Sequence, residues 1–126
     1  MSTTDIEAEE ALYELEAQIL QTDGIHTIHI YIDSIGHLVL GMLEIKREYR
    51  KRGIGTKIMN TLCEYADRYN MTMVLTPADR NKEMGTTGRG RLFKFYGQFG
   101  FVRNKGRNKN YRTMSAMIRR SLAPGI

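Results

Sequence analysis

Hydrophobic residues recur at helical spacing near the start of the chain. Between residues 5 and 20 they lie three or four positions apart among acidic residues, at Ala8, Leu12, Leu15 and Ile19. This spacing predicts an amphipathic helix with one apolar face. Asp23 and Gly24 follow, a pair that is typical of a helix end.

The next segment changes from helical spacing to alternation. Ile28, Ile30 and Ile32 alternate with other residues, and the turn-forming residues 33–36 precede an apolar run over residues 38–45. Alternation of this kind is typical of strands with one buried face. The segment therefore predicts two antiparallel strands joined by a hairpin.

A basic turn that contains glycine leads into a second helix. The apolar face of this helix is marked by Ile54, Ile58, Leu62, Tyr65, Ala66 and Tyr69. A short apolar strand over residues 71–76 follows and stops at Pro77. A strand, a helix and a strand in this order predict two parallel strands with a right-handed crossover.

The last third of the chain mixes a polar loop with short elements. Residues 78–90 are polar and contain three glycines, so we expect a loop that lines a site. A short helix should follow, with Leu92, Phe95, Tyr96 and Phe99 on one side. Strands are predicted near residues 101–102 and over residues 111–118. The whole pattern predicts an α/β fold with a mixed sheet flanked by helices.

Length and composition limit the possibilities further. A chain of 126 residues has room for one core, so residues 1–126 should form a single domain. No apolar run approaches the roughly 20 residues that cross a bilayer, and the first ten residues are acidic rather than signal-like, so we expect a cytoplasmic protein. The single cysteine, Cys63, argues against a disulfide and against a metal site, and we expect it to be buried on a helix.

Charge is distributed unevenly along the sequence. The formal net charge is +5, yet the first 23 residues are acidic and most lysines and arginines follow Lys46. The basic part should attract a polyanion, either a nucleic acid or a cofactor that carries phosphates.

One segment combines several features of a phosphate site. Residues 43–56 run from a strand through a basic turn into a helix, with Gly53 and Gly55 at the turn. The N-terminus of a helix presents unpaired N–H groups and a positive dipole end, both of which favour a bound phosphate. Glycine lets the main chain approach an anion closely. A glycine pair before a helix could instead only relieve crowding between helix and strand.

Two motifs lie in order along the chain, RxxGxG at residues 50–55 and a run with Leu92, Tyr96 and Gly100-Phe101 at residues 91–101. The first resembles the acetyl-CoA pyrophosphate loop of the GNAT superfamily of acyl-CoA-dependent N-acetyltransferases, and the second resembles that family's later helix and strand. The resemblance covers roughly residues 28–118 and implies the family's single-domain mixed sheet, with acetyl-CoA as co-substrate. It implies that the cofactor is bound by Leu43, Ile45, Arg50, Lys51, Arg52, Gly53, Ile54, Gly55 and Thr56.

The chain also departs from the family pattern. Lys51 stands where the loop often has glycine, Arg47 where proline is frequent, and Arg89 near the position of an asparagine that contacts the cofactor in many members. The part before the second strand is short, so acceptor recognition could be open or be completed by a second subunit, as in a homodimer.

The resemblance places Tyr96 at the position of the family's frequent general acid. Its phenol, with an ordinary pKa of about 10, could protonate the departing sulfur, or it could be a core tyrosine. For a general base we favour Glu44, which in a strand projects opposite to its apolar neighbours, although it could equally face solvent. His37, Asp79 and a water relay are weaker candidates.

These observations favour an acetyltransferase that acts on a primary amine of a small molecule or a protein. One alternative is a basic nucleic-acid-binding or inhibitory module on the same scaffold, and another is a scaffold that binds CoA without turnover. The basic residues 105–110 could bind an acidic acceptor, a cofactor phosphate or RNA. Core periodicity predicts that the methionines at 59, 71, 73, 114 and 117 are packing residues.

Overall fold

The computed structural model describes residues 3–77 and 89–121. Their elements are α1 (Thr3–Leu20), β1 (Ile25–Ile32), β2 (Leu38–Ile45), η1 (Arg47–Tyr49), α2 (Ile54–Arg68), β3 (Met73–Leu75), α3 (Arg89–Gly97), β4 (Val102–Arg103), η3 (Gly106–Asn108) and β5 (Met117–Arg119). None of the helices in these two stretches is long and apolar enough to cross a membrane.

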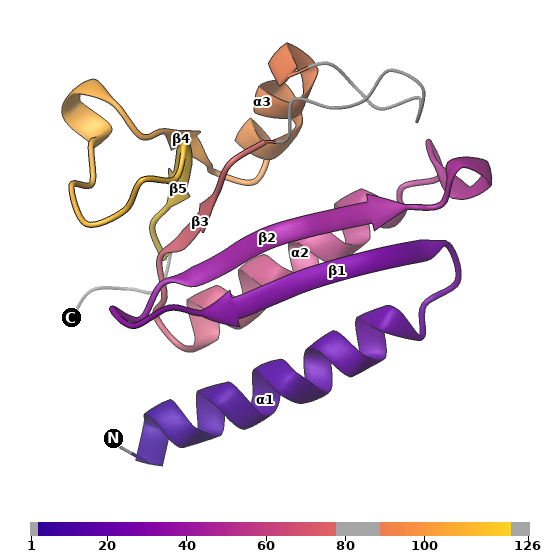
Figure 1. Cartoon of the computed structure of the whole chain (residues 1–126), viewed down its shortest axis with the longest axis horizontal. Coiled ribbons are helices and arrows are strands. Elements are labelled where there is room, and N and C mark those ends of the chain that lie inside the picture. Colours follow the sequence, from indigo (N-terminus) through magenta and orange to yellow (C-terminus); the bar gives the residue numbers. More distant parts are fainter. Residues whose placement is uncertain (1–2, 78–88, 122–126) are drawn as a thin grey trace.

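The strands of the described residues form one mixed sheet in the order β1-β2-β3-β5-β4 (Figure 1). β1 and β2 pair as the predicted antiparallel hairpin, and β4 pairs antiparallel with β5. β2 and β3 are parallel, and α2 makes the crossover between them. The predicted α/β architecture is therefore confirmed.

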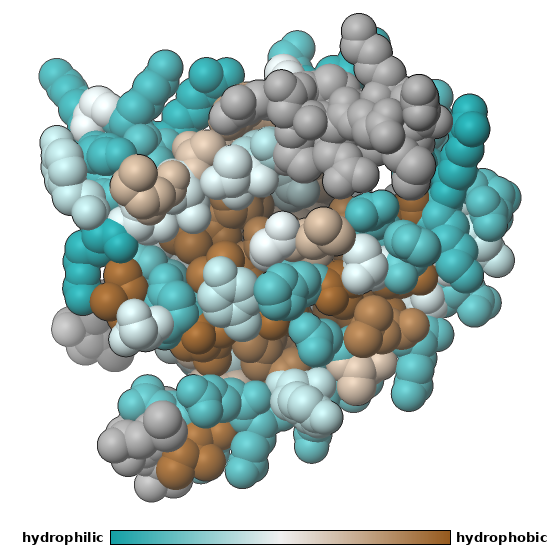
Figure 2. Space-filling model, viewed as in Figure 1, coloured by the Kyte–Doolittle hydropathy of each residue, from teal (hydrophilic) through white to brown (hydrophobic). Residues whose placement is uncertain are grey.

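The core lies between the sheet and α2. Leu38 and Met73, which pair across β2 and β3, are fully buried together with Met59 and Leu62 of α2. The predicted burial of Cys63 on this helix is confirmed, and burial raises the pKa of its thiol. In Figure 1, α2 lies behind β1 and β2, and Figure 2 shows apolar side chains on the middle of the face in view, ringed by hydrophilic ones.

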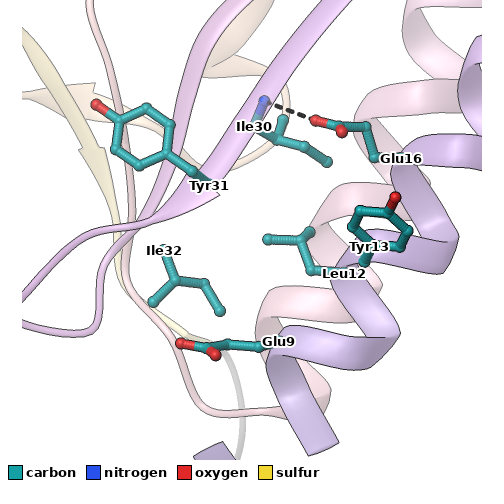
Figure 3. Close-up of a pocket in the computed structure, with 7 residues that line it drawn as sticks. All are labelled: Glu9, Leu12, Tyr13, Glu16, Ile30, Tyr31 and Ile32. Atoms are coloured by element: carbon teal, nitrogen blue, oxygen red, sulfur yellow. Dashed lines mark hydrogen bonds between the residues drawn. The ribbon is translucent and has the colours of Figure 1, made fainter. Parts of the chain in front are cut away.

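Helix α1 covers the outer edge of the sheet. β1 is an edge strand, so its outward amides need partners other than a neighbouring strand. The Glu16 carboxylate accepts a hydrogen bond from the Ile30 amide over 3.5 Å, and Leu12 lies against the same strand (Figure 3). A shallow cavity of about 240 Å³ remains between α1 and β1.

A buried ion pair joins the last strand to α2. The Arg119 guanidinium donates two hydrogen bonds of 3.0 Å to the Asp67 carboxylate, and its Nε donates to the Phe99 carbonyl. Arg119 is 3% exposed, so removing Asp67 would leave a buried charge without compensation. Arg119 thus joins β5 to α2 and to the turn that follows α3.

A tyrosine joins the two long helices, and its contribution to stability should disappear at high pH. The Tyr65 hydroxyl donates to the Ala8 carbonyl, and burial, with smaller contributions from Tyr69 and Glu9, raises its pKa to about 12. We expect Tyr65→Phe to lower the free energy of unfolding by about 1–2 kcal/mol at pH 7. Because the pKa is raised above the unfolded value near 10, this contribution is full below pH 10 and is lost as pH rises through 12.

Urea unfolding of the native protein and of Tyr65→Phe at a series of pH values tests this expectation. The difference between the two proteins should shrink between pH 10 and pH 12. A difference that stays constant over this range would show that the hydroxyl is not the group that titrates.

The C-terminal strand is shorter than its sequence pattern indicated. The prediction of a strand over residues 111–118 is wrong for residues 111–116, because β5 begins at Met117. Met114 is 98% exposed, so its expected place in the core is also wrong, whereas Met59, Met73 and Met117 are buried as expected. Alternating apolar residues before Met117 belong to a loop that pairs with no strand in the described part of the chain.

Candidate active site

The site begins where β2 and β3 separate. His29 pairs with Met42 and Ile30 pairs with Leu40, so Gly41 is an extra residue in β2. Such a bulge bends a strand and increases its twist. The parallel pairing with β3 ends at Leu40, opposite Leu75, and β2 continues to Ile45 beside β1 alone.

A cleft of about 530 Å³ occupies the space between the diverging strands. It is lined by Leu40, Gly41, Met42, Leu43, Glu44, Ile45, Arg50, Lys51, Gly53, Gly55, Thr56, Leu75, Thr76, Leu92, Phe95 and Tyr96. All residues of the predicted cofactor loop and both preferred catalytic residues lie on this lining except Arg52 and Ile54. Strand β2, the basic turn, the start of α2, the end of β3 and helix α3 thus contribute to one cavity.

The basic turn has the backbone geometry of an anion site. Lys51 and Gly53 have positive φ angles of 64° and 80°, and α2 begins directly after Gly53. Within the described residues, no internal acceptor is found for the amides of residues 51–56, and the first amide of this region that is paired is that of Lys57, which donates to Gly53. Successive unpaired amides at a helix N-terminus form a site for phosphate oxygens.

The two glycines are required for different reasons. A Cβ at Gly53 would meet no atom within 4 Å, so its positive φ is what favours glycine. A Cβ at Gly55 would lie 3.3 Å from Ile45 Cδ1 and 3.5 Å from Phe95 Cζ. The absence of a side chain at Gly55 therefore lets α2 pack closely against β2 and keeps this part of the cleft open.

Arg50 and Arg52 have contacts within the turn itself. The Arg50 Nε donates to the Ile45 carbonyl over 3.0 Å, which ties the turn to the end of β2. The Arg52 guanidinium lies 5.2 Å from the ring centroid of Tyr49, and Arg52 does not line the cleft. Ile54 is half-buried against the core, so only its main chain faces the turn.

Tyr49 and Gly24 were not found by sequence reasoning, although both position the turn. A Cβ at Gly24 would lie 2.6 Å from the Tyr49 ring, and the Gly24 carbonyl accepts from the Lys46 amide over 2.7 Å. Gly24 also has a φ of 91°. The Asp-Gly pair was interpreted only as a helix end, and no pattern in the sequence links it to a residue 25 positions later.

Lys51 provides a test of the turn geometry. A residue other than glycine in the left-handed region is strained, whereas glycine is not. We expect Lys51→Gly to be more stable than Lys51→Ala by about 0.5–1 kcal/mol, because both variants remove the charge and only one relieves the strain. Thermal or urea unfolding measures the difference.

Arg52 is the matched control for this comparison, because its φ is not positive. There the order should reverse, with Arg52→Ala more stable than Arg52→Gly. Equal stabilities of the two Lys51 variants would contradict the left-handed conformation at this residue.

Tyr96 reaches the cleft from helix α3. Its ring packs against Phe95 and Phe101, with centroids 5.2 and 6.0 Å away. Burial raises the pKa of Tyr96 above its ordinary value of 10, so the phenol is protonated at neutral pH. No hydrogen-bond partner of its hydroxyl occurs among residues 3–77 and 89–121.

Glu44 lines the cleft from the side of β2 opposite to Leu43. It pairs with Thr27, whereas Leu43 pairs with Ile28 on the face that contacts the core. Glu44 is half-buried. The side chains of β2 therefore border the cleft from both faces of the sheet.

The weaker base candidates do not share this position. His37 is buried at the other end of β2, where its Nδ1 lies 3.5 Å from the Asp33 carboxylate. Asp79 and most of the predicted loop over residues 78–90 lie outside the described residues, as does the side chain of Arg89. In the part of the chain that is described, no group of three or more His, Cys, Asp or Glu side chains could hold a metal ion.

Thr76 and Leu92 also line the cleft, although sequence reasoning assigned neither of them a role in binding or catalysis. Thr76 was interpreted as the end of a strand, and its hydroxyl accepts a hydrogen bond from the Ala116 amide over 3.1 Å. A polar residue just after a buried strand, before a proline, was the available signal. Leu92 looked like any apolar residue of an amphipathic helix.

Comparison with known proteins agrees with this architecture. Residues 10–101 match the model of the acetyltransferase (GNAT) family. Among solved structures, the chain is similar to Ard1 from Thermoplasma volcanium, with 17% identity and a TM-score of 0.47 over 75% of this chain and 62% of that protein. The chain thus spans about three fifths of that protein's length. No curated protein sequence matches it.

The family match extends from helix α1 through Phe101 and includes every strand that borders the cleft. Because it covers most of the sequence, the chain belongs to the acetyltransferase (GNAT) family.

Proposed function

We propose that this protein transfers an acetyl group from acetyl-CoA to a primary amine of a small molecule or a protein, by direct attack within a ternary complex. The observation that carries the proposal is the continuity of one cleft. It begins between the diverging strands β2 and β3 and ends at the unpaired amides that precede α2.

The main chain would hold the cofactor, and three basic side chains would add positive charge near it. The amides of residues 51–56 fit the diphosphate, and the turn's lysine and arginines add positive charge nearby. Among the described residues, no strand pairs with Leu43 to Ile45 on the β3 side of β2, and this edge could pair with the pantetheine arm. When bound, acetyl-CoA supplies an activated thioester.

Glu44 and Tyr96 would divide the proton transfers. The amine must lose a proton as its nitrogen forms a bond to the acetyl carbon, and Glu44 accepts that proton directly or through a water molecule. The carbon–sulfur bond breaks, and the electron pair leaves with the sulfur. Tyr96 donates its phenolic proton to this thiolate, and a proton from solvent restores the phenol.

Calorimetric titration with acetyl-CoA, followed by detection of free thiol with a panel of amines, tests the proposal. We expect saturable binding and thiol release that depends on the amine. Absence of acetyl-CoA binding, together with DNA or RNA binding that weakens steeply with salt, would replace the proposal with the nucleic-acid module considered above. Binding without thiol release from any amine would leave a scaffold that binds CoA without turnover.

A further inference from the structure

The loop between β4 and β5, residues 104–116, is strongly basic. From residue 84 to residue 126 the sequence contains no aspartate or glutamate, but it contains ten lysines and arginines. Lys105, Arg107 and Arg112 of the loop are exposed. Positive charge in this region is therefore not neutralised by carboxylates of the same segment, and it should attract anions.

A buried asparagine gives this loop a defined shape. The Asn104 side-chain amide donates to the carbonyls of Asn110, Thr113 and Ser115, and its oxygen accepts from the Asn110 amide over 2.6 Å. Asn104 is 8% exposed, whereas no side chain from residue 105 to residue 116 is buried. The loop is thus held in one conformation without contributing to the core.

The loop also exposes apolar contact groups. Tyr111 is 87% exposed and Met114 is 98% exposed. The Lys109 ammonium lies 5.8 Å from the Tyr111 ring centroid, which brings a cation and an aromatic face together on the surface. Large exposed side chains on an ordered loop are typical of binding surfaces.

One contact attaches the loop to a residue that lines the cleft, and another attaches the preceding strand to helix α3. At its end, the Ala116 amide donates to the hydroxyl of Thr76, which lines the cleft after β3. Just before its start, the Arg103 guanidinium lies 4.0 Å from the ring centroid of Phe93, next to Leu92 of the α3 wall. The phosphate-binding turn, in contrast, follows β2. Because Met117 pairs with Leu75, the loop ends beside the end of β3 where Thr76 lines the cleft, away from that turn, although no loop residue itself lines the cleft.

We propose that the β4–β5 loop is an acceptor subsite that binds negative charge carried next to the reacting amine. The acceptor would then be an amine on an anionic molecule, with carboxylate or phosphate groups contacting Lys105, Arg107 and Arg112. This inference rests on the proposed acetyl transfer and adds the class of acceptor to it. Such contacts weaken with salt, because the Debye length is about 8 Å at physiological ionic strength.

Two matched sets of acceptors test the inference with the full chain. One set contains pentapeptides that share a first residue with a free amino group. Their other four residues are all aspartate, all asparagine or all lysine. The other compares ethanolamine phosphate with ethanolamine. We expect the anionic member of at least one set to have the lower KM, with an advantage that shrinks as salt rises. The set that shows the advantage distinguishes carboxylates from phosphate.

Charge reversal assigns that advantage to the loop. Each of Lys105→Glu, Arg107→Glu and Arg112→Glu should raise the KM for the anionic acceptor by roughly fivefold. Arg68→Glu, an equal change of net charge on the exposed surface of α2, should leave it unchanged. The Kd for acetyl-CoA and the kcat with neutral amines should be the same in all four variants.

The outcomes separate this inference from the proposed function. If acetyl-CoA binds and neutral amines react, but anionic acceptors have no advantage or keep it in the loop variants, only the subsite is wrong. The loop variants could instead lose binding to a 20-nucleotide RNA while their KM for the acceptor is unchanged. This result would show that the loop binds a polyanion, and it would overturn the proposed subsite. If acetyl-CoA does not bind at all, both the subsite and the transferase proposal fail.

Discussion

Replacing Gly55 with valine is expected to weaken acetyl-CoA binding by roughly a hundredfold while the protein stays folded. A Cβ here already lies 3.3 Å from Ile45 Cδ1 and 3.5 Å from Phe95 Cζ. The two further methyl groups of valine must enter the cleft or displace these side chains. Loss of one or two charge-assisted hydrogen bonds from the amides costs about 3 kcal/mol, which corresponds to a factor of about a hundred.

Gly55 is a better position for this test than Gly53. Valine at Gly53 would have to adopt a φ of 80°, so that lost binding could reflect strain in the turn. Calorimetry gives the Kd, and thermal unfolding shows that the Gly55→Val variant is folded. Gly97→Val is the control, because a Cβ at Gly97 meets nothing within 4 Å and Gly97 does not line the cleft. A folded Gly55→Val protein with native affinity would remove the cofactor site from this turn.

Local patterns were sufficient to predict the elements that bury a clear apolar face. The alternation of Ile28, Ile30 and Ile32 corresponds to β1, and the helical spacing from Ile54 corresponds to α2. These patterns are strong because each element contacts the core along its whole length. The same reasoning failed over residues 111–116, where Met114 continues an alternating pattern but is exposed in a loop. Asn104 holds that loop through distant carbonyls, which no periodicity reveals.

The candidate site was predictable where a motif is contiguous and not where it depends on register. Residues 43–56 form one run of sequence, so the position of most of the predicted cofactor residues on the cleft followed from the order of strand, turn and helix, with Arg52 and Ile54 as exceptions. The divergence of β2 from β3 depends on the bulge at Gly41 and on the pairing of Leu40 with Leu75. Both depend on a pairing register, within the hairpin for the bulge and between segments 35 residues apart for Leu40 and Leu75, and a sequence alone does not specify such a register.

The phenol of Tyr96 should contribute to the chemical step rather than to cofactor binding. We expect Tyr96→Phe to lower kcat by about a hundredfold, because positioned acid catalysis of this kind contributes at least that factor. The Kd for acetyl-CoA should be unchanged, since phenylalanine keeps the ring contacts with Phe95 and Phe101. Steady-state kinetics with detection of free thiol, together with calorimetry, measures the two quantities.

Tyr69→Phe is the matched control, because Tyr69 is a half-buried tyrosine of similar character that does not line the cleft. The pH dependence adds a second criterion. Because burial raises the pKa of Tyr96 above 10, loss of its proton cannot cause a fall in rate between pH 7 and pH 9. A native rate that is constant in this range, with a hundredfold lower rate for Tyr96→Phe, fits proton donation. Equal kcat values for Tyr96→Phe and Tyr69→Phe would show that Tyr96 is only a packing residue. The departing thiolate would then be protonated by solvent.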